Sequence, residues 1–433
     1  MIKCLASAAV GAAVLGSVVA AEPAAAAPAA EYGAAVRIST PMGGGQGNGR
    51  SYQTTLSGSG RKAAFVTAAT NLTGADRNGT VEDVLVRDLD VGGLQRASVS
   101  GGEVQANGDS QGASLDWAGN RVAFTSSATN LAGTDRNGTP GDFAAQDVFV
   151  RDLRAGTTTR VSASSGGVAG NNFSYTPDLS GNGRYVAFAS AATDLVPGDT
   201  NGQLDVFVRD LQTGTTERIS VSTDGRSGNG RSDAPSISGD GRYVAFTSQA
   251  RNLVLGDTNA VADVFVRDRT AGTTRRVSVS ASGGQADGRS AVAALSNDGQ
   301  VVAMTTQTIN LGPGDGTGER TRTDLIVKDL RNGAVRVVAG PTFSQSLTAD
   351  GGTLLRAAER PSGTLDLLVQ DLATGERDTV NRLAGGGYAG DSSFASSALS
   401  ADGTVLTWDS SVNGIVADDT NFDYDVFITR SVS

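Results

Sequence analysis

The chain has 433 residues, with 45 acidic and 35 basic side chains and a formal net charge of -10. It contains no histidine and a single cysteine, Cys4. This composition excludes catalytic sites that need an imidazole base, histidine-ligated zinc or haem, and electrostatic capture of nucleic acid.

The first 30 residues have the features of an export signal. Lys3 gives a positive start, residues 5–21 are uncharged and mostly apolar, and small residues up to Ala30 offer several cleavage sites. We therefore predict a signal peptide and processing segment over residues 1–29, and a secreted, periplasmic or cell-envelope location. The alternative is a retained N-terminal membrane anchor, and no other stretch is expected to cross a bilayer.

From Arg37 onward the sequence is one repeat. An aspartate that opens a segment similar to DVFVRD returns at separations of 64, 58, 58, 61, 42 and 59 residues. Repetition at such a period is typical of repeat architectures. The aspartates define seven units and are Asp83, Asp147, Asp205, Asp263, Asp324, Asp366 and Asp425.

Each unit contains four segments rich in β-branched and aromatic residues. In the clearest unit they lie at 234–238, 244–248, 264–268 and 275–280, and Gly239-Asp240-Gly241 separates the first two. Such residues suit strands joined by tight hairpins. Because helical periodicity is absent, we predict an all-β fold, a seven-bladed β-propeller of four-stranded antiparallel blades.

The two ends of the repeat complement each other. After Asp425 the chain has room for a third strand but not for a fourth. The segment from Arg37 to Thr40 is similar to the fourth strand expected at 218–221. We therefore predict that residues 36–40 close the last blade and that the propeller spans residues 36–433, which would remove an exposed sheet edge.

The motif S-x-S-x-D-G-R-x-V-A-F-x-S, followed by D-V-F-V-R-D-L-x-T-G, resembles the TolB-type, WD40-like (PD40-type) propeller repeat of secreted bacterial proteins. The resemblance covers roughly residues 36–433. It implies a propeller used mainly as a binding scaffold, including interaction with envelope-associated proteins. TolB-type proteins pair six blades with an α/β domain, whereas this chain has seven repeats.

The long loops of the propeller are expected on one face and carry a recurrent Asp-x-Asn motif. Alternating oxygen ligands of this kind resemble the start of a calcium loop, so we predict calcium as a possible cofactor. The alternative is that these side chains cap their own backbone as Asx turns. The candidate metal ligands are Asp199, Asn201, Asp205, Asp257, Asn259, Asp263, Asp419, Asn421, Asp423 and Asp425.

The fifth and sixth units depart from the repeat. The sixth unit has a short loop, and the fifth has an arginine-rich stretch. These departures predict a low sector of the ring where an anionic peptide or glycan could bind, although drift in loop length is an equally good explanation. The candidate binding residues are Arg320, Arg322, Arg356 and Arg360.

Two functional classes remain. The first is an exported, non-catalytic, monomeric scaffold that binds a protein or an envelope glycan through its loop face. The alternative is a carbohydrate-active enzyme, a glycosidase or lyase, that uses paired carboxylates at the channel mouth. No catalytic residue is singled out, because repeated residues are usually architectural.

Overall fold

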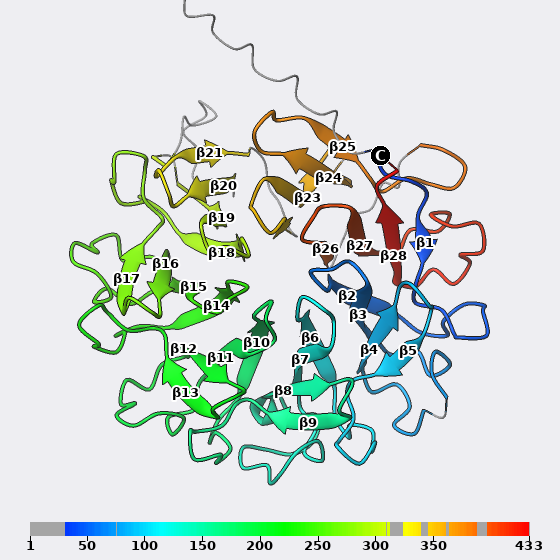
Figure 1. The fold of residues 1–433 in the computed structure, drawn as a ribbon, viewed down its shortest axis with the longest axis horizontal. Helices are drawn as coiled ribbons and strands as arrows, with labels where there is room; N and C mark the ends of the chain where they lie inside the picture. Colours follow the sequence, from blue (N-terminus) through cyan, green and yellow to red (C-terminus); the bar gives the residue numbers. More distant parts are fainter. Residues whose placement is uncertain are drawn as a thin grey trace, which may run out of the picture.

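The computed structural model describes residues 31–432, apart from 75, 309, 312–323, 339–344, 361–362 and 388–395. The predicted signal segment lies outside the described residues. Seven four-stranded sheets are arranged in a ring around a central channel (Figure 1). Among the described residues, no helix is long and apolar enough to span a membrane.

The strands follow one another in chain order, four to a blade. The first three blades are β2 (Ser51–Leu56), β3 (Lys62–Thr67), β4 (Asp83–Asp88) and β5 (Leu94–Arg96); β6 (Ser110–Leu115), β7 (Arg121–Ser126), β8 (Asp147–Asp152) and β9 (Thr157–Arg160); and β10 (Ser174–Leu179), β11 (Tyr185–Ser190), β12 (Asp205–Asp210) and β13 (Thr215–Arg218). A 3-10 turn, η1 (Phe143–Ala145), lies between β7 and β8.

The next three blades are β14 (Ser232–Ile237), β15 (Tyr243–Ser248), β16 (Asp263–Asp268) and β17 (Thr273–Arg276); β18 (Ser290–Leu295), β19 (Val301–Thr306), β20 (Asp324–Asp329) and β21 (Val335–Val337); and β22 (Gln345–Leu347), β23 (Thr353–Glu359), β24 (Leu365–Asp371) and β25 (Arg377–Thr379). The last blade is β26 (Ser397–Leu399), β27 (Val405–Ser410), β28 (Asp425–Arg430) and β1 (Val36–Arg37).

The closing strand is formed as predicted. β1 pairs antiparallel with β28, with Val36 opposite Ile428 and Arg37 opposite Phe427. The backbone N–H of Ile38 extends the pairing by donating to the Val426 carbonyl at 2.8 Å. The predicted fold class, an all-β seven-bladed propeller closed by the N-terminal strand, is therefore confirmed.

The hydrophobic core lies between neighbouring blades. Val66 and Val84 of the first blade pack with Phe124 and Phe149 of the second, and all four are fully buried. Strands that are buried on both faces have continuous apolar sequences, because neither face is in contact with water. This explains why the VAF and VFV segments do not alternate with polar residues.

The innermost strand of each blade leads to a tight turn, and these turns are joined around the channel. The backbone N–H of Trp117 donates to the Gly181 carbonyl at 2.9 Å, and Ala401 closes the circle by donating to Gly58 at 2.9 Å. Seven such bonds link every blade to the next. The other five run from Ser59 to Trp117, Asn182 to Gly239, Gly239 to Asn297, Asp298 to Ala349 and Ala349 to Ala401.

Candidate functional site

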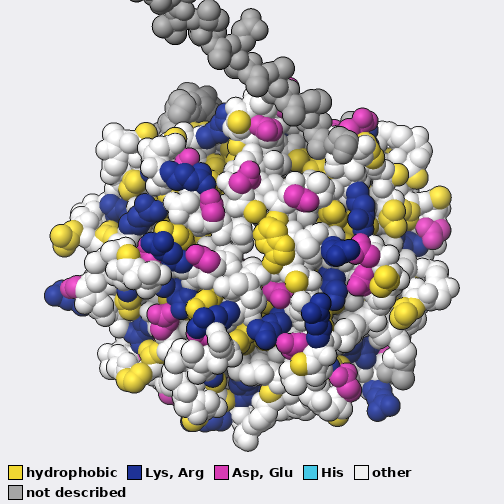
Figure 2. Space-filling view, in the orientation of Figure 1, with side chains coloured by type: hydrophobic (Ala, Val, Ile, Leu, Met, Phe, Trp, Pro, Cys, Tyr) yellow, Lys and Arg dark blue, Asp and Glu magenta, His cyan; other side chains and the backbone are white. Residues whose placement is uncertain are grey.

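The central channel contains a cavity of about 490 Å³. Its walls are the innermost strands and the turns that follow them. On the face shown in Figure 2, acidic and basic side chains surround apolar ones near the ring axis. Among the described residues that line the cavity, Asp178 is the one charged side chain.

Asp178 interrupts the repeat at a channel-lining position. This position is the residue before the last Leu or Ile of each innermost strand, and in β10 it lies before Leu179. The other six blades carry small side chains there, which are Thr55, Ser114, Ser236, Ala294, Ser346 and Ala398. A carboxylate in place of a hydroxyl or methyl group is therefore specific to the third blade.

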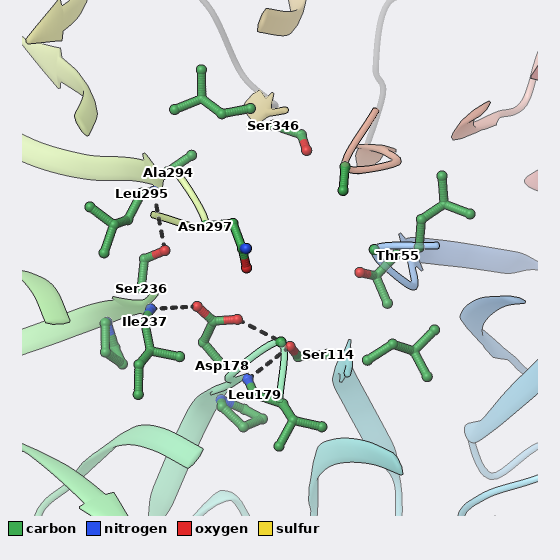
Figure 3. Close-up of a pocket in the computed structure, with 18 of the residues that line it drawn as sticks. Thr55, Ser114, Asp178, Leu179, Ser236, Ile237, Ala294, Leu295, Asn297 and Ser346 are labelled. Carbon is green, nitrogen blue, oxygen red and sulfur yellow. Dashed lines mark hydrogen bonds between the residues drawn. The ribbon is translucent and has the colours of Figure 1, made fainter. Parts of the chain in front are cut away.

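The Asp178 carboxylate is held on both sides (Figure 3). Its Oδ2 accepts from the backbone N–H of Ile237 at 2.8 Å, and its Oδ1 accepts from the Ser114 hydroxyl at 3.1 Å. Ser114 in turn accepts from the N–H of Leu179 at 3.0 Å. Burial raises the pKa of Asp178, and these hydrogen bonds oppose that shift without cancelling it. Asp178 is thus a positioned carboxyl with raised basicity.

Two larger side chains line the turn end of the same cavity. Trp117 is 43% exposed and packs over Gly58, where an added Cβ would lie 2.8 Å from the indole. The Asn297 carboxamide points into the cavity (Figure 3). The equivalent turn positions carry only Gly or Ala. Asp178, Trp117 and Asn297 were not predicted, and their signal in the sequence is that each differs from the residues at equivalent positions.

The predicted metal ligands lie in another place, at the loop end of the third strands. In each of three blades, an arginine from the fourth strand lies between the two aspartates. The distances are 3.0 and 3.7 Å from Arg218 to Asp199 and Asp205, 3.7 and 3.7 Å from Arg276 to Asp257 and Asp263, and 3.6 and 3.4 Å from Arg37 to Asp419 and Asp425. Each predicted carboxylate pair therefore already has a guanidinium within ion-pair distance of both of its members.

The arginine and the Asp-x-Asn loop occur together along the chain. An arginine follows the strand aspartate by 13 residues in the first four blades, as in Asp205 and Arg218. The fifth and sixth blades lack the Asp-x-Asn motif, and Val337 and Thr379 stand at that position. This joint loss indicates that the aspartates and the arginine form one structural unit.

The asparagines of the motif make the backbone bonds of Asx turns. Asn201 Oδ1 accepts from the N–H of Gln203 at 2.8 Å, and Asn421 Oδ1 accepts from the N–H of Asp423 at 3.1 Å. Asn259 accepts likewise from Val261 at 3.2 Å. The described residues contain no group of three or more His, Cys, Asp or Glu side chains suited to a metal ion. Calcium binding stays a prediction, tested below.

The four arginines of the predicted binding notch do not form one described surface. Arg320 and Arg322 lie outside the described residues. Arg356 is 4% exposed within β23, where its Nε donates to Gln370 at 3.3 Å, and Arg360 pairs with Asp366. The notch therefore stays a prediction that depends mainly on Arg320 and Arg322.

No protein-family model and no curated protein matches this sequence. Solved structures similar to the chain include an oligogalacturonate lyase in complex with manganese, with a TM-score of 0.57 and 13% identity over 93% of this chain and 96% of that one. Another similar structure is from a study of two prolyl endopeptidases, with a TM-score of 0.52 and 13% identity over 90% of this chain and 51% of that one. TolB from Acinetobacter baumannii aligns at a TM-score of 0.41 and 16% identity over 77% of this chain and 64% of that one.

The fold is a seven-bladed β-propeller, as predicted, and TolB is among the solved structures that align with it. The leading functional prediction is corrected. A non-catalytic scaffold was expected because the repeat accounts for most residues, but rings of this fold occur in enzymes, including the lyase and the prolyl endopeptidases. The alternative, a carbohydrate-active enzyme, has the better support.

Proposed function

We propose that this chain is an exported carbohydrate-active enzyme that acts in the central channel, with Asp178 as its acid-base group and an acidic oligosaccharide as its substrate. The observation that carries the proposal is the placement of one half-buried carboxylate, Asp178, where the other blades have hydroxyl or methyl groups. The similarity in fold to an oligogalacturonate lyase, over nearly the full length of both chains, supports the substrate class.

A lyase reaction suits a channel with one carboxylate. In β-elimination from a uronate, a base removes the proton on carbon 5 and the bond from carbon 4 to the glycosidic oxygen breaks. A double bond forms between these carbons, and the leaving oxygen takes a proton from water. Asp178 would accept the first proton, and its raised pKa makes it a stronger base than an exposed aspartate.

Hydrolysis by two carboxylates has less support. A glycosidase of the usual kind needs an acid and a second carboxylate on the other side of the scissile bond. The described lining of the cavity supplies Asp178 but no second carboxylate. The manganese of the similar lyase also lacks a counterpart among the described side chains, so no step is assigned to a metal.

The test is to incubate the purified protein with uronate polymers and with neutral glucans. We expect products that absorb in the ultraviolet, because β-elimination leaves a double bond conjugated to the carboxylate. Asp178→Ser, which restores the residue type of the neighbouring blades, should remove this activity. If folded protein releases no unsaturated product from any uronate polymer, the proposed function is wrong.

The predicted signal segment, residues 1–29, fits an enzyme that meets polysaccharides outside the cytoplasm. N-terminal sequencing of the protein recovered from the culture medium or the cell envelope would test export. Detection of an uncleaved chain in the cytoplasm would contradict it. A protein partner on the loop face stays a prediction.

A further inference from the structure

The loop between β7 and β8 carries an insertion that the propeller does not need. Asp135 and Asp147 are 12 residues apart, whereas the equivalent aspartates of the next two blades are separated by six. The shorter loops support blades with the same strands and the same buried phenylalanines. The extra residues therefore serve something other than the closure of the ring.

The insertion is folded in a way that presents one aromatic side chain. Asp142 caps the 3-10 turn by accepting from the N–H of Ala144 at 3.0 Å, and Ala145 is fully buried beneath it. Gly138 packs so closely on Ala145 that an added Cβ would lie 2.7 Å from it. Phe143 remains 58% exposed on this fixed turn.

Phe143 joins two aromatic rings of the third blade. Its ring centroid lies 5.1 Å from that of Phe173 and 6.4 Å from that of Tyr175, and the latter two are 5.9 Å apart. All three rings are at least partly exposed. Exposed ring faces offer a flat apolar surface with a negative potential, on which the C–H groups of a sugar can stack.

A cation lies beside these rings. Arg231 donates to the Tyr175 hydroxyl at 3.0 Å and to Asp233 at 2.8 Å, and its side chain is still 53% exposed. A guanidinium has five N–H donors, so Arg231 retains donors for a carboxylate. Aromatic rings next to an accessible guanidinium are suited to a sugar that carries a carboxylate, which is a uronate.

The aromatic surface and the channel share one strand. Tyr175 and Asp178 lie on the same innermost strand, β10, with Asp178 lining the cavity. Thr176 and Pro177 separate them, and a bulge shifts the register of β10 against β11 at this point. An oligosaccharide that rests on the rings can therefore extend along β10 towards the Asp178 carboxylate.

We infer that Phe143, Phe173, Tyr175 and Arg231 form a binding subsite for a uronate-containing oligosaccharide at the loop end of the channel. The inference rests on the proposed function and adds where, and by which groups, the substrate binds. The insertion in the second blade then has a role, because it supplies the exposed ring of the subsite.

Binding is measured by calorimetric titration of a defined oligogalacturonate, and of a neutral cello-oligosaccharide of the same length, into Asp178→Ser so that the ligand is not consumed. In this background, Phe143→Ala should weaken binding of the oligogalacturonate about tenfold, the equivalent of about 1.4 kcal/mol. Arg231→Gln should weaken it as well, with no effect on the neutral sugar. Phe422→Ala is the matched control, because Phe422 is 82% exposed on the loop of another blade.

Unchanged affinity in Phe143→Ala, or the absence of oligogalacturonate binding in every variant, would overturn the inference. Kinetics separate it from the proposed function. Without the Asp178 substitution, Phe143→Ala should raise KM and leave kcat nearly unchanged. If oligogalacturonate binds and Phe143→Ala weakens it while the native chain never cleaves it, the subsite stands and the lyase proposal fails.

Discussion

The hydroxyl of Ser39 donates a hydrogen bond of 2.5 Å to Asp425, across 386 residues of sequence. Both side chains are fully buried. The same bond recurs within single blades, for example from Ser220 to Asp205 at 2.6 Å. The N-terminal segment thus provides the last blade with contacts that the other blades make within their own continuous chain.

Removal of this segment should weaken the whole ring. A chain that begins after Thr40 loses β1, the buried Ser39 hydroxyl and the Arg37 guanidinium that lies 3.0 Å from Asp418 and 3.4 Å from Asp425. We expect the melting temperature to fall by roughly 5–10 °C. A chain that begins at Glu31 is the control, and equal melting of the two would contradict the role of β1 in closure.

The fourth-strand arginine that contacts each Asp-x-Asn loop should determine the response to calcium. Because Arg218 already lies beside Asp199 and Asp205, we expect millimolar calcium to leave the melting temperature of the native chain unchanged. Arg218→Gln leaves two buried carboxylates without their cation, so calcium should raise its melting temperature relative to chelator. A calcium-dependent shift in the native chain would instead support the predicted metal sites.

The stability of the last blade should depend on pH through Asp419. Burial, and then the charge of Asp425, raise the pKa of Asp419 from 3.8 to about 6. The folded state therefore holds the Asp419 proton more tightly than the unfolded state does. The free energy of unfolding falls as the pH rises from the unfolded pKa of 3.8 through the folded pKa of about 6. In chelator, Asp419→Asn should melt about 2–4 °C above the native chain at alkaline pH, with no gain below the unfolded pKa. Asp423→Asn is the control for the change in net charge. If Asp419→Asn raises the melting temperature by the same amount at every pH, the effect does not come from the ionisation of Asp419.

Substitution of Asp178 should separate activity from stability. In Asp178→Ser the serine hydroxyl can still accept from the N–H of Ile237, just as the Ser236 hydroxyl accepts from the N–H of Leu295 at 3.2 Å. The substitution also removes a carboxylate that is costly to ionise, because burial raises its pKa. We expect turnover to fall about 100-fold or more, while the melting temperature at neutral pH stays equal or rises. Circular dichroism melts and product assays on the same preparation would measure both. A parallel loss of folding and turnover would assign Asp178 a structural role instead.

Crowding at the turn end of the channel can be tested at Gly239. A Cβ added there would lie 1.8 Å from Oδ1 of Asn297, so Gly239→Ala should lower the melting temperature by about 2–4 °C. The second substitution Asn297→Ala should restore it, because Ala349 and Ala401 already occupy equivalent turns. If the melting temperature of the double variant does not recover, the loss of stability in Gly239→Ala is not caused by contact with Asn297.

The ring could be predicted from the sequence because every blade repeats the same local signals. Strand segments, hairpin turns and the similarity of residues 37–40 to a fourth strand depend on short-range pattern. The arginine partners of the Asp-x-Asn loops were missed because Arg218 and Arg276 were interpreted only as strand residues. Their constant distance from Asp205 and Asp263 was the available signal.

Asp178 was missed for a different reason. Within the segment SYTPDLS it reads as one more polar residue of a strand, and only the ring places it in the channel. Burial raises its pKa, and the hydrogen bonds that oppose this shift come from Ile237, Ser236 and Ser114 of neighbouring blades. Contacts between blades arise from the closure of the ring, so they could not be derived from any single repeat.

The seven turn-to-turn hydrogen bonds use backbone atoms alone. The width of the channel is therefore set by the number of blades, while the side chains at the turns are free to differ, as Gly58, Trp117 and Asn297 show. New chemistry can arise at one blade by a single substitution, with no change in the neighbours' geometry. The symmetry of this protein thus allows a charged side chain such as Asp178 to be acquired in the channel at little structural cost.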